Sequence, residues 1–246
     1  MRLAVIADVH GNDLALEAVL SDIERLGVTD IVNLGDTVSG VLNAARTADI
    51  LMARNIPTVR GNHDRWLVQK HPDAMGVWDR PAWAELATQH LNWLANLPAT
   101  VTPQAGVLLC HANPVDDTTY WLHQPSSDGR MQLASSAHIE ALAQQCEARL
   151  MLCGHTHLAG LVRLADGRSV LNPGSVGCQA YRDDEPFSHT VESGSPEARY
   201  AVLHLGEHDI DVSFRVVAYD HMRMARLAEL RGDAEWAEAL ATGRLR

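Results

Sequence analysis

Potential metal ligands follow apolar segments at several places along this chain. Asp8 and His10 come after LAVIA, and His155 and His157 come after LMLCG. Carboxylate, amide and imidazole groups bind divalent transition metals, so their recurrence at such positions suggests a metal site. In chain order, the residues placed in this way are Asp8, His10, Asp36, Asn62, His63, His111, His155 and His157.

Each of these residues also has an ordinary interpretation when it is taken alone. Asp8 and Asp36 could cap helices, and His111 could be a core histidine. The stretch RGNHDRW at residues 60–66 could be a turn, and GHTH at 154–157 could lie on a solvated strand face. Because the feature recurs at five predicted strand ends, and because α/β sheets hold ligands at the carboxyl ends of their strands, we favour one common site.

The elements that position these residues are predicted from the apolar pattern. Short apolar runs bounded by polar turns indicate strands buried on both faces, and the segments between several of them have one apolar helical face. Strands that alternate with helices indicate a layered α/β architecture. The predicted strands lie at residues 2–8, 30–36, 56–62, 106–112, 149–155 and 169–175, and the predicted helices at 12–27, 80–98 and 135–148.

The last third of the chain has a different pattern. Residues 200–219 have the alternation of two antiparallel strands in a hairpin, and residues 220–246 form an amphipathic helical tail. Residues 181–199 are polar and lack periodicity, so we expect a mobile surface loop there. The length of 246 residues favours one domain over 1–246.

The composition limits the classes of function. With 31 acidic and 20 basic residues the formal net charge is −11, and no basic cluster stands out, which argues against non-specific binding of nucleic acid. No apolar run approaches the roughly 20 residues of a membrane helix, so we expect no membrane partner and a cytoplasmic location. The four cysteines lack zinc-binding spacing and are expected to be buried thiols.

The ligand types limit the metals. A set of carboxylates, one amide and imidazoles, without thiolates, suits Mn, Fe, Zn, Co or Ni better than Ca²⁺ or Cu(I). Seven ligands are too many for one ion with an open position. They suit two ions that share one bridging carboxylate.

The motifs DVHGN, GDTVSG, GNHD, the histidine at 111 and GHTH closely resemble the signature of the calcineurin-like metallophosphoesterases. Within that superfamily they are similar to the small bacterial branch of YfcE-like and diadenosine-tetraphosphatase-like phosphodiesterases. The resemblance covers roughly residues 1 to 205. It implies a four-layer α/β/β/α sandwich of two mixed sheets flanked by helices.

The resemblance also implies a role for each ligand. The first metal would be held by Asp8, His10 and His157, the second by Asn62, His111 and His155, with Asp36 bridging both. His63 would not bind metal but would protonate the leaving oxygen or stabilise its charge, and Asp64 would orient the His63 imidazole. Mn and Fe are the favoured metals.

The expected function is therefore that of a dinuclear metal-dependent phosphoesterase. A metal-bridging hydroxide would attack a small phosphodiester or phosphomonoester. The alternative is hydrolysis of a dinucleoside polyphosphate such as diadenosine tetraphosphate, and a protein phosphatase or a non-catalytic scaffold is less favoured.

Contacts with the substrate are less well defined by the sequence. Arg182 or Arg60 could add a guanidinium fork to a phosphate oxygen. Tyr120 and Trp121 could stack on a base or an aromatic leaving group, or could equally pack a loop onto the helical layer. The sequence leaves the oligomeric state open.

Overall fold

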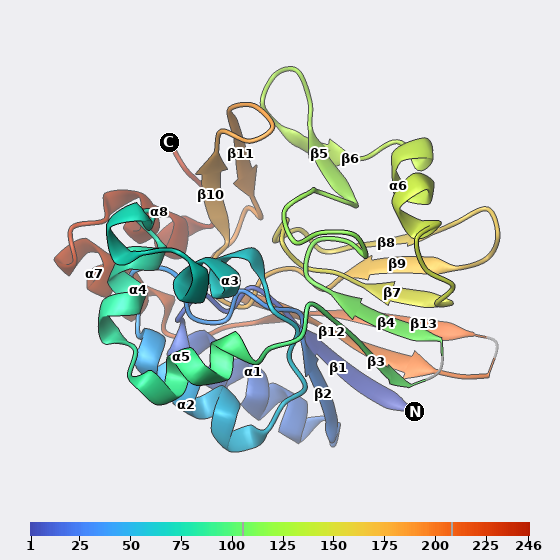
Figure 1. Ribbon diagram of the computed structural model, residues 1–246, viewed down its shortest axis with the longest axis horizontal. Coiled ribbons are helices and arrows are strands. Elements are labelled where there is room, and N and C mark those ends of the chain that lie inside the picture. The colour runs from blue at the N-terminus through green and yellow to red at the C-terminus, as the bar shows by residue number, and fades with distance from the viewer. Residues whose placement is uncertain (105, 208) are drawn as a thin grey trace.

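The computed structural model describes residues 1–104, 106–207 and 209–246, and contains two main mixed β-sheets with helices around them (Figure 1). The first sheet has the strand order β13-β12-β1-β2. In it β1 (Arg2–Ile6) pairs in parallel with β2 (Asp30–Asn33) and antiparallel with β12 (Ala198–Leu205), which continues to β13 (Ile210–Val217). The predicted hairpin over 200–219 is confirmed by the antiparallel pairing of β12 and β13.

The second sheet has the strand order β3-β4-β7-β9-β8. Its three inner strands run parallel, and each edge strand is antiparallel to its neighbour. The strands are β3 (Thr100–Gln104), β4 (Val107–Cys110), β7 (Leu150–Leu152), β8 (Gly160–Arg163) and β9 (Ser169–Asn172).

The side chains of β1 show how the layers are arranged. Leu3 and Val5 belong to the core between the two sheets, which also contains Leu109 of β4. Ala4 and Ile6 point to the opposite face, because successive strand residues alternate, and pack against helix α1 (Asp13–Arg25). Strand β1 is therefore buried on both faces, as its apolar run predicts.

Helix α6 (Ser136–Ala143) covers the outer face of the second sheet. Its residues Ile139 and Ala143 share a core with Met151 of β7 and Val170 of β9. The order helix, sheet, sheet, helix is the four-layer α/β/β/α arrangement that the resemblance implied.

The predicted helix over 80–98 is two helices, α4 (Asp79–Glu85) and α5 (Thr88–Ala95). Leu86 leaves the helical conformation with ψ 130°. The backbone N–H of Ala87 then donates to Nδ1 of His90 at 3.1 Å, which caps the start of α5. Apolar periodicity does not report such a side-chain cap, so the break was not predicted.

The strand predicted over 56–62 is reduced to a single bridge between Thr58 and Asn33. Pro57 has no N–H to donate, and the N–H of Arg60 donates to Pro98 instead, at 2.7 Å. From Asn62 the chain is helical, as α3 (Asn62–Gln69).

Further helices surround the sheets. They are α2 (Ala44–Arg54) and the short 3₁₀ helix η1 (Pro72–Ala74). The predicted helical tail forms two helices, α7 (His221–Leu230) and α8 (Ala234–Thr242), separated at Gly232, where φ is +85°.

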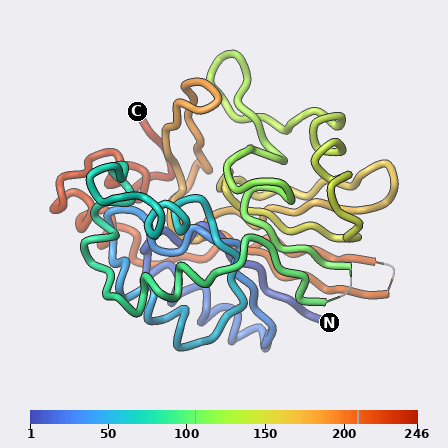
Figure 2. Tube along the Cα trace, viewed as in Figure 1, coloured from blue at the N-terminus to red at the C-terminus, as the bar shows by residue number. Residues whose placement is uncertain are grey.

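The mobile loop expected over 181–199 is instead mostly a hairpin of β10 (Ala180–Asp183) and β11 (His189–Glu192). Its apolar residues Tyr181 and Val191 pack in one core with the tail helices, which the polarity of the surrounding residues concealed. Beyond α8 the backbone N–H of Leu245 donates to Glu192 of this hairpin at 2.7 Å, and Figure 2 shows the C-terminal end beside it. A second small hairpin joins β5 (His123–Pro125) to β6 (Met131–Leu133).

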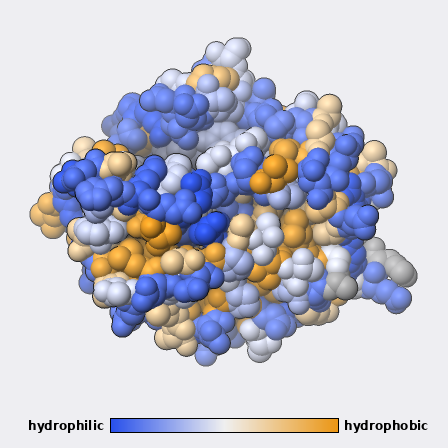
Figure 3. Space-filling view, viewed as in Figure 1, coloured by the Kyte–Doolittle hydropathy of each residue, from blue (hydrophilic) through white to orange (hydrophobic). Residues whose placement is uncertain are grey.

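The surface drawn in Figure 3 is mainly hydrophilic, with hydrophobic residues in separate patches. Among the described residues, no helix has the length and apolarity needed to cross a membrane.

Candidate metal centre

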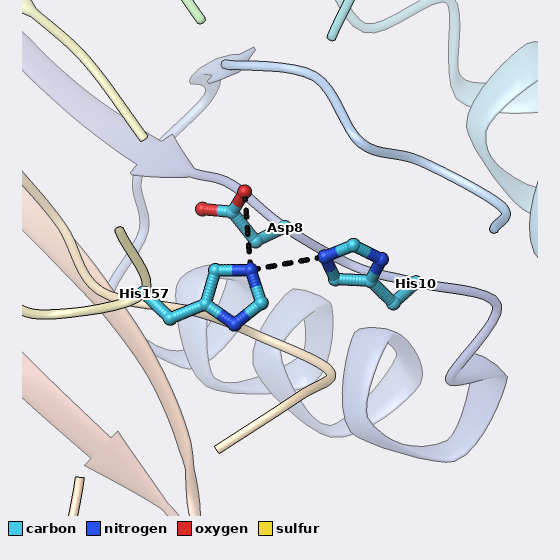
Figure 4. A group of neighbouring side chains, drawn as sticks. All are labelled: Asp8, His10 and His157. Carbon is cyan, nitrogen blue, oxygen red and sulfur yellow. Dashed lines mark hydrogen bonds and ion pairs between the residues drawn. The ribbon is translucent and has the colours of Figure 1, made fainter. Parts of the chain in front are cut away.

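The first group of potential ligands is Asp8, His10 and His157. Asp8 and His10 lie in the loop between β1 and α1, and His157 lies in the loop after β7 (Figure 4). Nε2 of His157 is 3.0 Å from Nε2 of His10 and 3.6 Å from Oδ1 of Asp8. All three side chains are buried, and one ligand atom from each lies within 4.8 Å of the others.

The second group is Asp36, His111 and His155, whose ligand atoms also lie within 4.8 Å of one another. Oδ2 of Asp36 is 3.2 Å from Nε2 of His111 and 4.0 Å from Nε2 of His10, so this carboxylate stands between the two groups. Oδ1 of Asn62, the first residue of α3, is 3.0 Å from Nε2 of His111. The fold thus brings all seven predicted ligands into one region.

Carbonyl oxygens fix the orientation of three imidazoles. A carbonyl can only accept, so the ring nitrogen facing it carries the hydrogen, and the other nitrogen of the neutral ring keeps its lone pair for a metal. The donor–acceptor pairs are His111 Nδ1 to Leu34 O (2.7 Å), His157 Nδ1 to Cys178 O (2.8 Å) and His155 Nε2 to Thr118 O (2.8 Å).

The ligand loops have an uncommon backbone conformation. Residues other than glycine rarely adopt positive φ, and such strain collects at functional sites. Five of the seven predicted ligands do so, namely Asp8 (54°), His10 (48°), Asp36 (52°), His155 (68°) and His157 (57°).

The buried charges of the site are distributed unequally. Burial raises the pKa of Asp8 to about 8. Burial opposes ionisation of Asp36 too, but the positive charges of His111 and His63 outweigh it and hold the pKa of Asp36 well below its usual range. Burial would lower the pKa of His111, yet the Asp36 carboxylate raises it to about 10. In the metal-free protein the His111 imidazolium therefore neutralises Asp36.

The other three imidazoles among the candidate ligands stay neutral. Burial lowers the pKa of His10 to about 3 and that of His155 to about 4. Burial and the neighbouring His10 together hold the pKa of His157 well below its usual range. Neutral imidazoles are the form in which histidine binds a metal.

His63 lies beside both groups on helix α3, but its partner is not the one the sequence suggested. Nδ1 of His63 is 2.5 Å from Oδ1 of Asp79, which is buried at the start of α4. Burial opposes protonation of His63, but the Asp36 and Asp79 carboxylates outweigh it and raise its pKa.

Asp64 was expected to orient the His63 imidazole, and this pairing is wrong. The Asp64 carboxylate accepts backbone N–H bonds from Asp36 (2.9 Å), Thr37 (2.9 Å) and Gly61 (3.0 Å), as well as the Thr37 hydroxyl (2.6 Å). It supports the loop that carries Asp36. Asp79 was missed because it lies 16 residues from His63 with no motif to connect them.

A cavity of about 900 Å³ opens over the two groups and His63. Tyr120 and Arg182 line it, whereas Arg60 is not among the described residues that do. The Arg182 guanidinium is held by the Glu235 carboxylate and donates to the terminal oxygen of Arg246 at 2.7 Å.

Of the two alternatives for Trp121, the structure supports packing onto the helical layer rather than stacking on a substrate, because Trp121 is not among the described residues that line the cavity. It is 1% exposed, and its Nε1–H donates to Ile139 O at 3.0 Å in the core beneath α6.

Comparisons with known proteins agree with this geometry. Residues 1–194 match the model of the calcineurin-like phosphoesterase superfamily domain. An uncharacterised protein of Methanocaldococcus jannaschii is 28% identical over 189 residues, which are 71% of this chain and 76% of that protein.

Two crystal structures are similar over almost their whole lengths. A metallophosphoesterase from Sphaerobacter thermophilus is 25% identical with a TM-score of 0.75, covering 99% of this chain and 100% of its own. A hypothetical protein from Pyrococcus horikoshii OT3 is 19% identical with a TM-score of 0.80, covering 100% and 99%. At 19% identity, the similarity to the Pyrococcus horikoshii protein concerns the fold alone.

Proposed function

Since this chain belongs to the calcineurin-like phosphoesterase superfamily, we propose that it is a metal-dependent enzyme that hydrolyses a small phosphodiester or phosphomonoester. The observation that carries the proposal is the convergence of the two ligand groups on either side of Asp36. Seven buried or half-buried polar side chains that face one another serve no packing purpose without a cation.

The donor set fits two divalent cations. Asp8, His10 and His157 would hold one, Asn62, His111 and His155 would hold the other, and Asp36 would bridge them. Oxygen and neutral imidazole donors without thiolates suit Mn, Fe, Zn, Co or Ni. When bound, such a pair polarises a phosphoryl group and lowers the pKa of water, so that a nucleophile is available near neutral pH.

His63 is the group that would deliver a proton to the leaving oxygen. Its Nδ1 is engaged by Asp79 at 2.5 Å, and the ring lies 5.7 Å from the His10 ring, centroid to centroid. The raised pKa of His63 favours the protonated imidazole, which is the form that a general acid requires. Asp79, rather than Asp64, is its positioning residue.

The charge of the cavity favours a short phosphate ester over a dinucleoside polyphosphate. Among the described lining residues the basic side chains are Lys70 and Arg182, and the acidic side chains of Asp183 and Glu185 line the same cavity. A chain of four phosphates would need more cations than these, because Arg182 is already paired with Glu235.

The test combines metal analysis with a substrate panel. We expect about two transition ions per chain, and Mn²⁺-dependent hydrolysis of bis-p-nitrophenyl phosphate or p-nitrophenyl phosphate but little hydrolysis of diadenosine tetraphosphate. Asp36→Asn should lose metal and activity together. His63→Gln should keep the metal and lose about 100-fold or more in kcat on esters with poor leaving groups.

A protein that binds no transition metal and hydrolyses none of these esters would contradict the proposal. It would indicate a scaffold that keeps the fold for binding.

A further inference from the structure

Aromatic residues are concentrated around the cavity that covers the candidate metal centre. The chain has six tryptophans, four tyrosines and two phenylalanines. Five of these side chains line this one cavity, namely Trp66, Trp78, Tyr120, Tyr181 and Phe187. A phosphate group alone needs no such walls, so the rest of the substrate must account for them.

Helix α3 leads from the metal centre into the aromatic part of the cavity. His63 and Trp66 are spaced i and i+3 on one face of the helix, Lys70 follows at its C-cap, and all three line the cavity. At a rise of about 1.5 Å per residue, Lys70 lies about 10 Å along the axis from His63. A leaving group that takes its proton from His63 would extend past Trp66.

Exposed apolar side chains mark the outer part of the cavity. Val77, just before α4, is 75% exposed, and Phe187, in the turn of the β10–β11 hairpin, is 43% exposed, and both line the cavity. Large apolar side chains left open to water in a concave site gain by covering a ligand. These two come from separate parts of the fold and could contact one group from two sides.

The charges in this region suit an uncharged group. Nζ of Lys70 lies 3.8 Å from the centroid of the Trp66 ring, which occupies one face of the indole. Arg182 is engaged by Glu235, and Asp183 and Glu185 add negative charge. The outer cavity therefore offers packing surface rather than free cations.

We propose that the leaving group of the substrate carries a flat aromatic ring, which packs against Phe187, Val77 and the part of Trp66 that lines the cavity. This rests on the proposed phosphoesterase function. Water adds to phosphorus and loses a proton to solvent, the bond between phosphorus and the leaving oxygen breaks, and the departing alkoxide takes a proton from His63, which regains one from solvent. A nucleobase and a simple aryl group share the required chemistry.

Three methyl phosphodiesters test the subsite, with benzyl, 5′-thymidyl and 2-methoxyethyl as the second group. All three second groups leave as primary alcohols, and ³¹P NMR distinguishes which alcohol departs. We expect release of benzyl alcohol or thymidine, with kcat/KM above that of the methoxyethyl ester. Preference for thymidine over benzyl alcohol identifies a nucleobase as the source of the ring, and the reverse identifies an aryl group.

Phe187→Ala and Phe214→Ala are the matched variants, because both side chains are 43% exposed and Phe214 lies on β13, away from the cavity. Phe187→Ala should lower kcat/KM about fivefold for the aromatic esters and leave the methoxyethyl ester unchanged. Phe214→Ala should change neither. His63→Gln removes turnover, so binding of the benzyl ester to this variant can be measured by calorimetry. Adding Phe187→Ala to His63→Gln should raise the Kd of the benzyl ester by the same factor of about five.

The outcomes separate the two proposals. Hydrolysis of all three esters at equal rates, insensitive to Phe187, overturns the aromatic subsite and keeps the phosphoesterase. Phe187-dependent binding without hydrolysis of any ester overturns the enzyme function and keeps the subsite. Neither binding nor hydrolysis overturns both.

Discussion

At the scale of single residues, the pairing of His63 with Asp79 gives the first prediction. Asp79→Asn removes the carboxylate that helps to raise the pKa of His63. His63 must be protonated to act as an acid, so activity is lost as pH rises through its pKa. The variant should therefore move the alkaline limb of the kcat–pH profile to lower pH and reduce kcat about tenfold or more on alkyl esters, with metal content unchanged.

Asp64→Asn is the contrasting change. The Asp64 carboxylate accepts hydrogen bonds from the backbone N–H groups of Asp36, Thr37 and Gly61. Loss of the carboxylate should loosen the loop that carries Asp36 and reduce both metal content and thermal stability. If Asp64→Asn shifted the pH profile and Asp79→Asn did not, the assignment of the positioning residue would be reversed.

The convergence of the candidate ligands could be predicted because each follows an apolar run at a predicted strand end, whereas the partner of His63 could not be predicted. Neighbouring residues on a helix point about 100° apart, so Asp64 faces back towards Gly61 while His63 faces the cavity. Adjacency in GNHD was therefore misleading. Asp79 reaches His63 only because the chain turns between α3 and α4.

At the scale of elements, the loop 173–178 holds the end of β1 in place. Gly177 N–H donates to Asp8 O at 2.9 Å, and the Ser175 hydroxyl donates to the same oxygen at 2.8 Å. The two loops are in close contact, since a Cβ on Gly177 would lie 1.7 Å from Val9 O. Only glycine allows the loop after β9 to support Asp8 at this distance.

Gly177→Ala should therefore push the two loops apart and displace Asp8 and His10. We expect a loss of about 3 kcal/mol in the free energy of unfolding and a fall in bound Mn²⁺ from about two ions towards one. Denaturant unfolding and metal analysis check this. Gly76→Ala is the matched control, because a Cβ there meets nothing within 4 Å, and it should keep both values. Normal metal content in Gly177→Ala would show that metal binding by Asp8, His10 and His157 tolerates movement of the loop between β1 and α1.

The elements that sequence analysis located correctly are those with a strong apolar pattern, such as β1, β4 and α1. The break between α4 and α5 depends on the buried His90 side chain, and the β10–β11 hairpin depends on packing against the tail helices. Both features depend on tertiary contacts, which do not appear as a periodic pattern of apolar residues in the local sequence.

At the scale of the whole molecule, the chain has a net charge of −11, whereas the substrate that we propose is an anionic phosphate ester. Its basic residues contribute little near the site, since Lys70 and Arg182 are both engaged. The proposed cations would supply the positive charge instead. Metal binding should then depend on pH, because a bound cation displaces protons that the candidate ligands hold in the folded metal-free protein.

This linkage gives a prediction about pH. The folded metal-free protein has raised pKa values at Asp8, about 8, and at His111, about 10. Between pH 6.5 and 8 these two groups therefore hold protons that they would have lost in the unfolded chain, and their contribution to stability falls as pH rises. The two cations take the place of these protons, one at Asp8 and one at His111, so the affinity for each cation should rise about tenfold per pH unit for each proton that it displaces.

The difference in Tm between protein with a fixed Mn²⁺ concentration and protein with chelator should consequently widen from pH 6.5 to pH 8. Calorimetry in buffers of different ionisation enthalpy should record about two protons released per chain at pH 7. His71→Gln, which changes an exposed histidine outside the site, should leave the widening intact. A difference in Tm that stayed constant or narrowed with pH would mean that the cations do not displace these protons, and that the ligand groups do not act as one metal centre coupled to the fold.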